Sequence, residues 1–207
     1  MDILLTIFSL IILLFSIMLH EVAHGTVAYH LGDPTAKYEG RLTMNPLKHL
    51  DPFGSIILPL LLLLLTFGRG PIFGWAKPVP INPYNFSDQK WGNLKVAVAG
   101  PLMNFIVALL FSLFCRITIF PQGMLVIFSL IAIYNFAWGI FNLIPIPPLD
   151  GSWILFSFLP EKYNGIKIFL QRYGIFILLF LVFFCLGFIF NWSVSLFQII
   201  SAQSILF

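Results

Sequence analysis

The feature that most restricts this chain is a series of long apolar runs that carry almost no charge. The first extends from Ile3 to Leu19, and others cover about residues 94–115, 123–144 and 173–190. A helix of about 20 apolar residues crosses the hydrocarbon core of a bilayer, because each residue adds about 1.5 Å. Only 9% of the chain is charged, against about 25% in soluble domains. The sequence therefore predicts an all-α polytopic membrane protein with about four full transmembrane helices, in a single domain over residues 1–207.

A further apolar stretch, Phe53 to Phe67, is shorter and has Pro59 in its middle, and the segment after it, Gly68 to Pro83, is dense in Gly and Pro. A complete crossing by this stretch would put the ends of the first span and of the 123–144 span on opposite sides of the membrane. Because the candidate site described next needs those two ends together, we predict a short re-entrant segment followed by an extended Pro-rich loop. Irregular backbone is allowed at membrane depth where protein or a water-filled cavity covers it.

The segment His20-Glu21-Val22-Ala23-His24 lies where the first apolar run ends, on a helix expected to continue to about Leu31. Residues four apart on a helix differ by about 40° around the axis and about 6 Å along it, so both imidazoles can face one metal ion. Zinc accepts imidazole nitrogens, lowers the pKa of a bound water to about 7 and polarises a carbonyl. Glu21 is placed to take a proton from that water and pass it to a leaving amine. Ionisable groups inside a span cost about 2.5–3.5 kcal/mol each on insertion scales, which favours a metal site over a coincidental match.

A catalytic zinc has three protein ligands as a rule, so a third is needed. On a continuing helix, His30 lies about 9 Å and roughly 120° away from His24 and cannot reach the same ion. His49 lies in a polar stretch beside Lys48, which favours a solvated loop histidine. Asp150 follows a Pro-rich turn at the end of a span, where a lone carboxylate is costly, and it is the stronger candidate; the alternative is a helix cap.

Three motifs follow one another along the chain: His20-Glu21-Val22-Ala23-His24, Ala99-Gly100-Pro101-Leu102-Met103-Asn104 and Asn142-Leu143-Ile144-Pro145-Ile146-Pro147-Pro148-Leu149-Asp150-Gly151. With these motifs in this order, the chain resembles the site-2 protease family of intramembrane zinc metalloproteases. The resemblance covers nearly the whole chain. It implies one Zn²⁺ per chain held by His20, His24 and Asp150, with Glu21 as the catalytic acid and base. It also implies that Asn142 handles substrate or stabilises the reacting carbonyl. We expect Asn104 to make an interhelical hydrogen bond.

The chain departs from several family members because it contains neither a PDZ nor a CBS domain. It resembles the compact subgroup that has Phe73-Gly74-Trp75-Ala76-Lys77-Pro78-Val79-Pro80. Prolines favour an extended backbone, so Trp75, Lys77, Pro78, Val79 and Pro80 are candidates for binding an unwound substrate by strand addition. The alternative is a loop anchored by Trp75 at the membrane interface.

The basic residues of the loops fall on the side of the membrane that carries the ends of the histidine-bearing span. The positive-inside rule makes that side cytoplasmic, so we expect an integral protein of the cell membrane whose site opens toward the cytoplasm. The net charge of +3 is scattered between apolar runs and does not indicate a nucleic-acid partner. Cys115 and Cys185 lie in apolar runs and are expected to be core residues rather than a disulfide.

The leading hypothesis is therefore an enzyme that hydrolyses peptide bonds in or near transmembrane segments of other membrane proteins, with the lipid bilayer as its surroundings. A membrane zinc hydrolase of lipids or lipidated peptides would share the same metal ligands. A metal transporter would need polar ligands along several spans, whereas the ionisable residues here gather around one site. A non-catalytic relative that binds membrane helices is disfavoured by the presence of Glu21.

Overall fold

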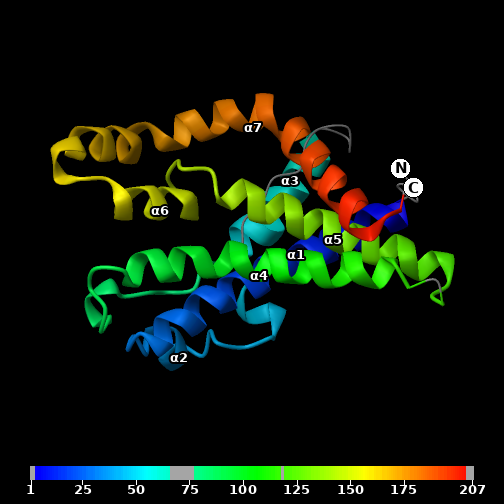
Figure 1. Ribbon diagram of the computed structural model, residues 1–207, viewed down its shortest axis with the longest axis horizontal. Coiled ribbons are helices and arrows are strands. Elements are labelled where there is room, and N and C mark those ends of the chain that lie inside the picture. Colours follow the sequence, from blue (N-terminus) through cyan, green and yellow to red (C-terminus); the bar gives the residue numbers. More distant parts are fainter. Residues whose placement is uncertain (1–2, 66–76, 118, 204–207) are drawn as a thin grey trace.

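The computed structural model describes residues 3–65, 77–117 and 119–203, and these form helices joined by short turns (Figure 1). The long helices are α1 (Ile3–His30), α4 (Gly92–Cys115), α5 (Gln122–Asn142) and α7 (Asn164–Ser201). The shorter ones are α2 (Thr35–Tyr38), a π-helix (Pro52–Ile57) that leads into α3 (Leu58–Leu65), and α6 (Asp150–Phe158). Short 3-10 turns cover Pro46–Lys48, Pro83–Asn85 and Glu161–Tyr163. No strand occurs in these described ranges, in agreement with the expected all-α class.

Four of the described helices are long and apolar enough to cross a membrane, which confirms the number of spans predicted from the sequence. A helix satisfies every backbone hydrogen bond within its own segment, and apolar side chains cover it where water is absent. The first helix ends where the chain must turn, because Gly32 adopts φ +104° and Pro34 follows shortly after it.

Helix α4 is central to the bundle and packs against α1, α5, α6 and α7. Small side chains allow this close approach: Ala108 of α4 and Ala132 of α5 are fully buried. Beside them Phe136 and Phe197 bring α5 and the C-terminal half of α7 into the same apolar core. The apolar core therefore joins α4, α5 and α7.

The chain returns to the same end of the bundle between α1 and α4. The N–H of Ser87 donates to the carbonyl of Leu31 at 2.7 Å, so the start of α4 lies beside the end of α1. The intervening segment therefore makes no net crossing, as the ligand geometry requires. Its helical part, residues 52–65, extends for about 21 Å at 1.5 Å per residue, less than the roughly 30 Å of the hydrocarbon core. The chain would turn back within residues 66–76, and this segment lies outside the described residues. Re-entry itself therefore stays a prediction.

Helix α7 is longer than the span of 173–190 expected from hydropathy. It contains 38 residues and continues through the apolar segment after Asn191 as far as Ser201. Figure 1 shows α7 bending near its middle. Its N-terminal half lies over α6 in this view, and its C-terminal half turns toward α5, where Phe197 joins the apolar core.

Candidate metal centre

Helix α1 presents His20 and His24 on one face, one turn apart. Their Nε2 atoms lie 3.0 Å from each other, and the rings meet nearly perpendicular, at 84°. Both side chains are buried, with exposed fractions of 3% and 6%. The spacing of four on a helix therefore aims two imidazole nitrogens at one point, as predicted.

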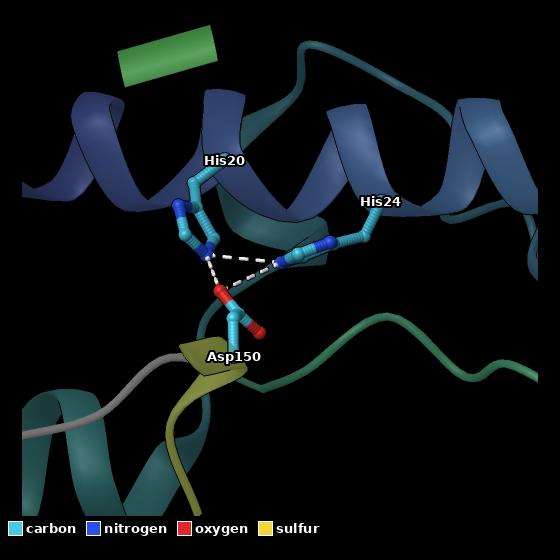
Figure 2. Close-up of side chains that lie close together, drawn as sticks. All are labelled: His20, His24 and Asp150. Carbon is cyan, nitrogen blue, oxygen red and sulfur yellow. Dashed lines mark hydrogen bonds and ion pairs between the residues drawn. The ribbon is translucent and has the colours of Figure 1, made fainter. Parts of the chain in front are cut away.

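Helix α6 brings Asp150 to the same point from the other end of the sequence (Figure 2). The Pro-rich turn after α5 places Asp150 as the first residue of α6, with its side chain directed at α1. Its Oδ2 lies 2.9 Å from His20 Nε2 and 3.2 Å from His24 Nε2. The structure thus brings together the three residues that the sequence nominated as metal ligands.

The outer nitrogens of both rings are already bonded to oxygen atoms. His24 Nδ1–H donates to the carbonyl of Val96 at 2.7 Å, and His20 Nδ1 lies 2.6 Å from Oδ1 of Asn104. A carbonyl oxygen only accepts, so the proton of each neutral ring is on Nδ1 and Nε2 carries a lone pair. Two imidazole lone pairs and a carboxylate oxygen then face one another about 3 Å apart, an arrangement that repels unless a cation lies among them.

The distances within the cluster suit a small divalent ion. Ligands at about 2.0–2.1 Å in tetrahedral geometry are about 3.3 Å apart, and the three separations here are 2.9, 3.0 and 3.2 Å. Gly100 of α4 forms the wall beside the imidazoles, since a Cβ there would lie 2.5 Å from His20 Nε2 and would also overlap His24 Nε2. The nitrogen and oxygen donors and their spacing therefore fit a zinc-like metal.

Two stripes of residues, each with a spacing of four, build this centre. On α1 they are Ser16, His20 and His24, and on the antiparallel α4 they are Asn104, Gly100 and Val96, in that pairing order. Each α1 residue meets its α4 counterpart directly. Gly100 and Ser16 were not predicted as site residues, although the repeated spacing of four on both helices is a signal that indicates them.

Glu21 lies on the neighbouring face of α1 and is outside the ligand group. Its Oε2 accepts a hydrogen bond from the N–H of Val79 at 2.9 Å. The carbonyl of the same peptide group, from Pro78, accepts from the guanidinium of Arg41 at 3.2 Å, and the carbonyl of Lys77 accepts from it at 2.6 Å. Arg41 is 5% exposed. A single peptide group therefore connects a buried guanidinium to the candidate catalytic carboxylate.

The loop after residue 77 is less free than the sequence indicated. The N–H of Lys77 donates to the carbonyl of His49, so the polar groups of residues 77–79 that could pair with a substrate strand are largely engaged. Few of these groups are therefore left to pair with a substrate strand, and substrate binding by this loop stays a prediction. Val79 is buried, whereas Lys77 and Pro78 are exposed and Pro80 is partly exposed. Trp75, the other residue expected in this loop, lies outside the described residues.

The far end of the loop is fixed by Asp33, which is fully buried. Its Oδ2 accepts from the N–H of Asn82 at 2.7 Å, and its Oδ1 accepts from the Asn85 amide at 2.8 Å and from the Thr35 hydroxyl at 2.5 Å. Burial favours the protonated carboxyl, but the hydrogen bonds from Thr35, Asn82 and Asn85 outweigh it and hold the pKa of Asp33 below its usual value. The loop is thus attached at both ends to the segment that follows α1.

A cleft of about 310 Å³ opens onto the three ligands. Glu21, Asn142, Pro78 and Val79 line it, while Lys77 and Pro80 do not. The side-chain amide of Asn142 donates to the carbonyl of Trp138 in its own helix at 3.0 Å, so Asn142 is held at the cleft wall rather than in the ligand group.

The two histidines set aside as ligands lie away from the centre. His30 is exposed at the end of α1. His49 is fully buried, so the expectation of a solvated loop histidine was wrong; its Nε2–H donates to the carbonyl of Thr43 at 3.0 Å. Its burial results from the packing of the polar segment under the loop, which local composition does not reveal.

Comparison with known proteins gives a consistent set of relatives. A family model described as "Peptidase family M50" matches residues 116–182. "Putative zinc metalloprotease YwhC" of Bacillus subtilis is 37% identical, over 84% of this chain and 79% of the relative. Two proteins of Methanocaldococcus jannaschii are each 34% identical: "Putative zinc metalloprotease MJ0611", over 74% of this chain and 72% of the relative, and "Zinc metalloprotease MJ0392", over 76% and 36%. No solved structure matches the chain.

Proposed function

Because this chain belongs to peptidase family M50, we propose that it is an intramembrane zinc metalloprotease that hydrolyses peptide bonds in or near transmembrane segments of membrane proteins. The observation that carries the proposal is the convergence of His20 Nε2, His24 Nε2 and Asp150 Oδ2 within 3.2 Å of one another inside a bundle of four candidate spans. Three such ligands leave one position of a tetrahedral site for water or substrate.

In this proposal His20, His24 and Asp150 hold one Zn²⁺ per chain. When bound, zinc lowers the pKa of a water in the fourth position and polarises the carbonyl that this water attacks. Glu21 takes the proton released by the attacking water and delivers it to the amine that leaves when the peptide bond breaks. The hydrogen bond from Val79 N–H fixes the orientation of the Glu21 carboxylate during both transfers.

Helical geometry supports an unwound substrate. The peptide groups of a transmembrane helix are bonded within their own segment, so local hydrogen bonds must be lost before a scissile carbonyl can reach the ligands. The cleft that opens onto the ligands has a volume of about 310 Å³. Asn142, on the cleft wall, is in a position to bind a carbonyl of that extended segment, and Pro78 and Val79 supply an apolar wall against its side chains.

The same proposal includes an orientation. The segments that carry Arg41, Lys77 and Lys95 all lie at the end of the bundle where the cleft opens, which the positive-inside rule assigns to the cytoplasm. The proposed partners are transmembrane protein substrates within the cell membrane.

The test is cleavage of a panel of single-span membrane proteins by the purified chain in lipid nanodiscs. We expect zinc-dependent cleavage within or beside the span, and loss of cleavage with retention of zinc in Glu21→Gln. Glu39→Gln makes the same chemical change at an exposed position and serves as the matched control. Robust cleavage by Glu21→Gln would remove Glu21 from the mechanism. Absence of cleavage by a wild-type chain that holds one zinc would contradict general peptide hydrolysis and favour a lipid or lipidated peptide as substrate.

A further inference from the structure

A buried polar network extends from the metal centre into the middle of the bundle. Ser16, Asn104 and Asn135 come from α1, α4 and α5, and their exposed fractions are 2%, 0% and 1%. They lie among apolar side chains at a depth where an unpaired amide costs several kcal/mol. The network contacts His20 at one end and does not itself reach the ligand atoms.

The direction of every hydrogen bond in this network is fixed by backbone carbonyls. Asn135 Nδ2 donates to the carbonyl of Ile131 at 2.8 Å and to Ser16 Oγ at 2.9 Å. Ser16 Oγ–H in turn donates to the carbonyl of Ile12 at 2.8 Å. A carbonyl cannot donate, so the amide nitrogen of Asn135 must face Ile131, and its oxygen Oδ1 must face Asn104.

The same reasoning orients Asn104. Its Nδ2 donates to Asn135 Oδ1 at 2.9 Å and to the carbonyl of Ser16 at 3.2 Å. Both of its amide protons are then used, and reversing the amide would place oxygen against two acceptors. Oδ1 of Asn104 is therefore the atom presented to His20 Nδ1, at 2.6 Å. An oxygen at that position requires the proton of a neutral His20 ring to lie on Nδ1.

We propose that Asn104 and Asn135 are positioning residues that select the Nδ1–H tautomer of His20 and so leave its Nε2 free to bind the metal. The other tautomer would place an N–H within the ligand cluster and remove one of the three ligands. If Asn104 were free to rotate its amide, its Nδ2 could donate to Nδ1 of His20 and so stabilise the other tautomer. Asn135, on a third helix, prevents this rotation because its Oδ1 accepts from Asn104 Nδ2. The link to zinc affinity depends on the proposed function, whereas the tautomer of the metal-free protein does not.

His24 provides an internal control, because its Nδ1–H is held by the Val96 carbonyl and not by the network. The experiment is ¹⁵N NMR of histidine-labelled, metal-free protein in nanodiscs at about pH 8, where unperturbed histidine is neutral. Ring nitrogen shifts distinguish N–H from lone-pair nitrogen. We expect both histidines to be Nδ1–H in the wild type. In Asn104→Leu and Asn135→Leu we expect His20 to become a mixture of tautomers while His24 is unchanged.

Two further variants separate tautomer selection from simple stability. Asn104→Asp keeps an oxygen that accepts from His20, so we expect lower thermal stability with the Nδ1–H tautomer retained. Ser112→Ala removes another buried hydroxyl of α4, one that donates to the carbonyl of Ala108 in its own helix at 2.7 Å, and should leave both histidines unchanged. If Asn104→Leu does not fold, the His20 tautomer in Asn135→Leu and Asn104→Asp still tests whether the network selects it.

Zinc affinity, measured by competition with a chromophoric chelator, is the second readout. We expect the Kd for zinc to rise about 10–100-fold in Asn104→Leu and Asn135→Leu, as for other residues that orient a ligand. A pure Nδ1–H tautomer of His20 in folded Asn104→Leu or Asn135→Leu would overturn the inference, as would a changed tautomer with unchanged zinc affinity. A wild-type protein that showed the expected tautomers but bound no zinc would instead refute the proposed function.

Discussion

Helix α4 lies so close to α1 at Gly100 that a Cβ would overlap the histidines of α1, which makes Gly100→Ala an informative perturbation. A Cβ at this position would lie 2.5 Å from His20 Nε2 and 2.6 Å from His20 Cε1, and it would also overlap His24 Nε2. Ordinary contacts of a Cβ begin at 3.4 Å, so the imidazoles would have to withdraw by about 0.9 Å. The atoms in the way are the proposed ligand nitrogens themselves.

The size of that displacement sets the expected effect. Metal–ligand distances tolerate deviations of about 0.2 Å, and a misplacement of about 1 Å costs about 100-fold at a reacting centre. We therefore expect the Kd for zinc to rise at least about 100-fold and hydrolysis to fall to background. The fold should survive, because overpacking costs about 1–3 kcal/mol and replacing Gly by Ala within a helix returns about 0.5–1 kcal/mol.

The assay is zinc competition titration of purified protein, with helical content and thermal unfolding measured on the same samples. Gly123→Ala is the matched control, since Gly123 is also helical and a Cβ there meets no atom within 4 Å. Wild-type zinc affinity in folded Gly100→Ala would refute the assignment of His20 and His24 as a converging ligand pair.

The remaining predictions concern the third ligand and the two ends of the loop. Asp150→Asn should lower zinc retention after dialysis, measured by metal analysis, because an amide oxygen carries no charge; wild-type affinity would remove Asp150 from the ligand set. Arg41→Met should lower kcat/KM about 10–100-fold through misplacement of the Val79 N–H, with zinc content unchanged, and exposed Arg172→Met is its control; unchanged kinetics would show that the peptide connection to Glu21 has no role. Asp33→Asn should destabilise the protein by about 1–3 kcal/mol at neutral pH, because it places amide protons against buried donors. Since the pKa of Asp33 is lowered by folding, its contribution is present above the unfolded value of about 3.9 and is lost as pH falls through the folded value. The difference in Tm between wild type and Asp33→Asn should therefore narrow in that acidic range, and a difference independent of pH would contradict the ionised state.

The membrane spans could be predicted because hydropathy acts on every residue that faces lipid. Their limits could not be predicted equally well, and α7 illustrates why. Its predicted span of 173–190 corresponds to the thickness of a bilayer, but the helix begins at Asn164 after Pro160 and ends only where Ala202 adopts φ 56°. Helix ends depend on turns and capping, and a hydropathy window does not detect either.

The convergence of His20, His24 and Asp150 could be expected because few arrangements account for ionisable residues at the ends of apolar runs. Asn104 was expected to make an interhelical hydrogen bond, and it does, to Asn135. Its contact with His20 was not foreseen. That contact depends on the register between two antiparallel helices, which is determined by packing along their whole length rather than by any local pattern.

The position of the ligands along the chain has a consequence for biosynthesis. His24 and Asp150 are 126 residues apart, which corresponds to about 6–25 s of translation at 5–20 residues per second. During that interval α1 enters the membrane with its histidines and Glu21 but without the carboxylate from α6. In the proposed enzyme, hydrolytic competence therefore arises only when the later helices have been inserted, so the nascent chain and the insertion machinery around it would not be exposed to a complete active site.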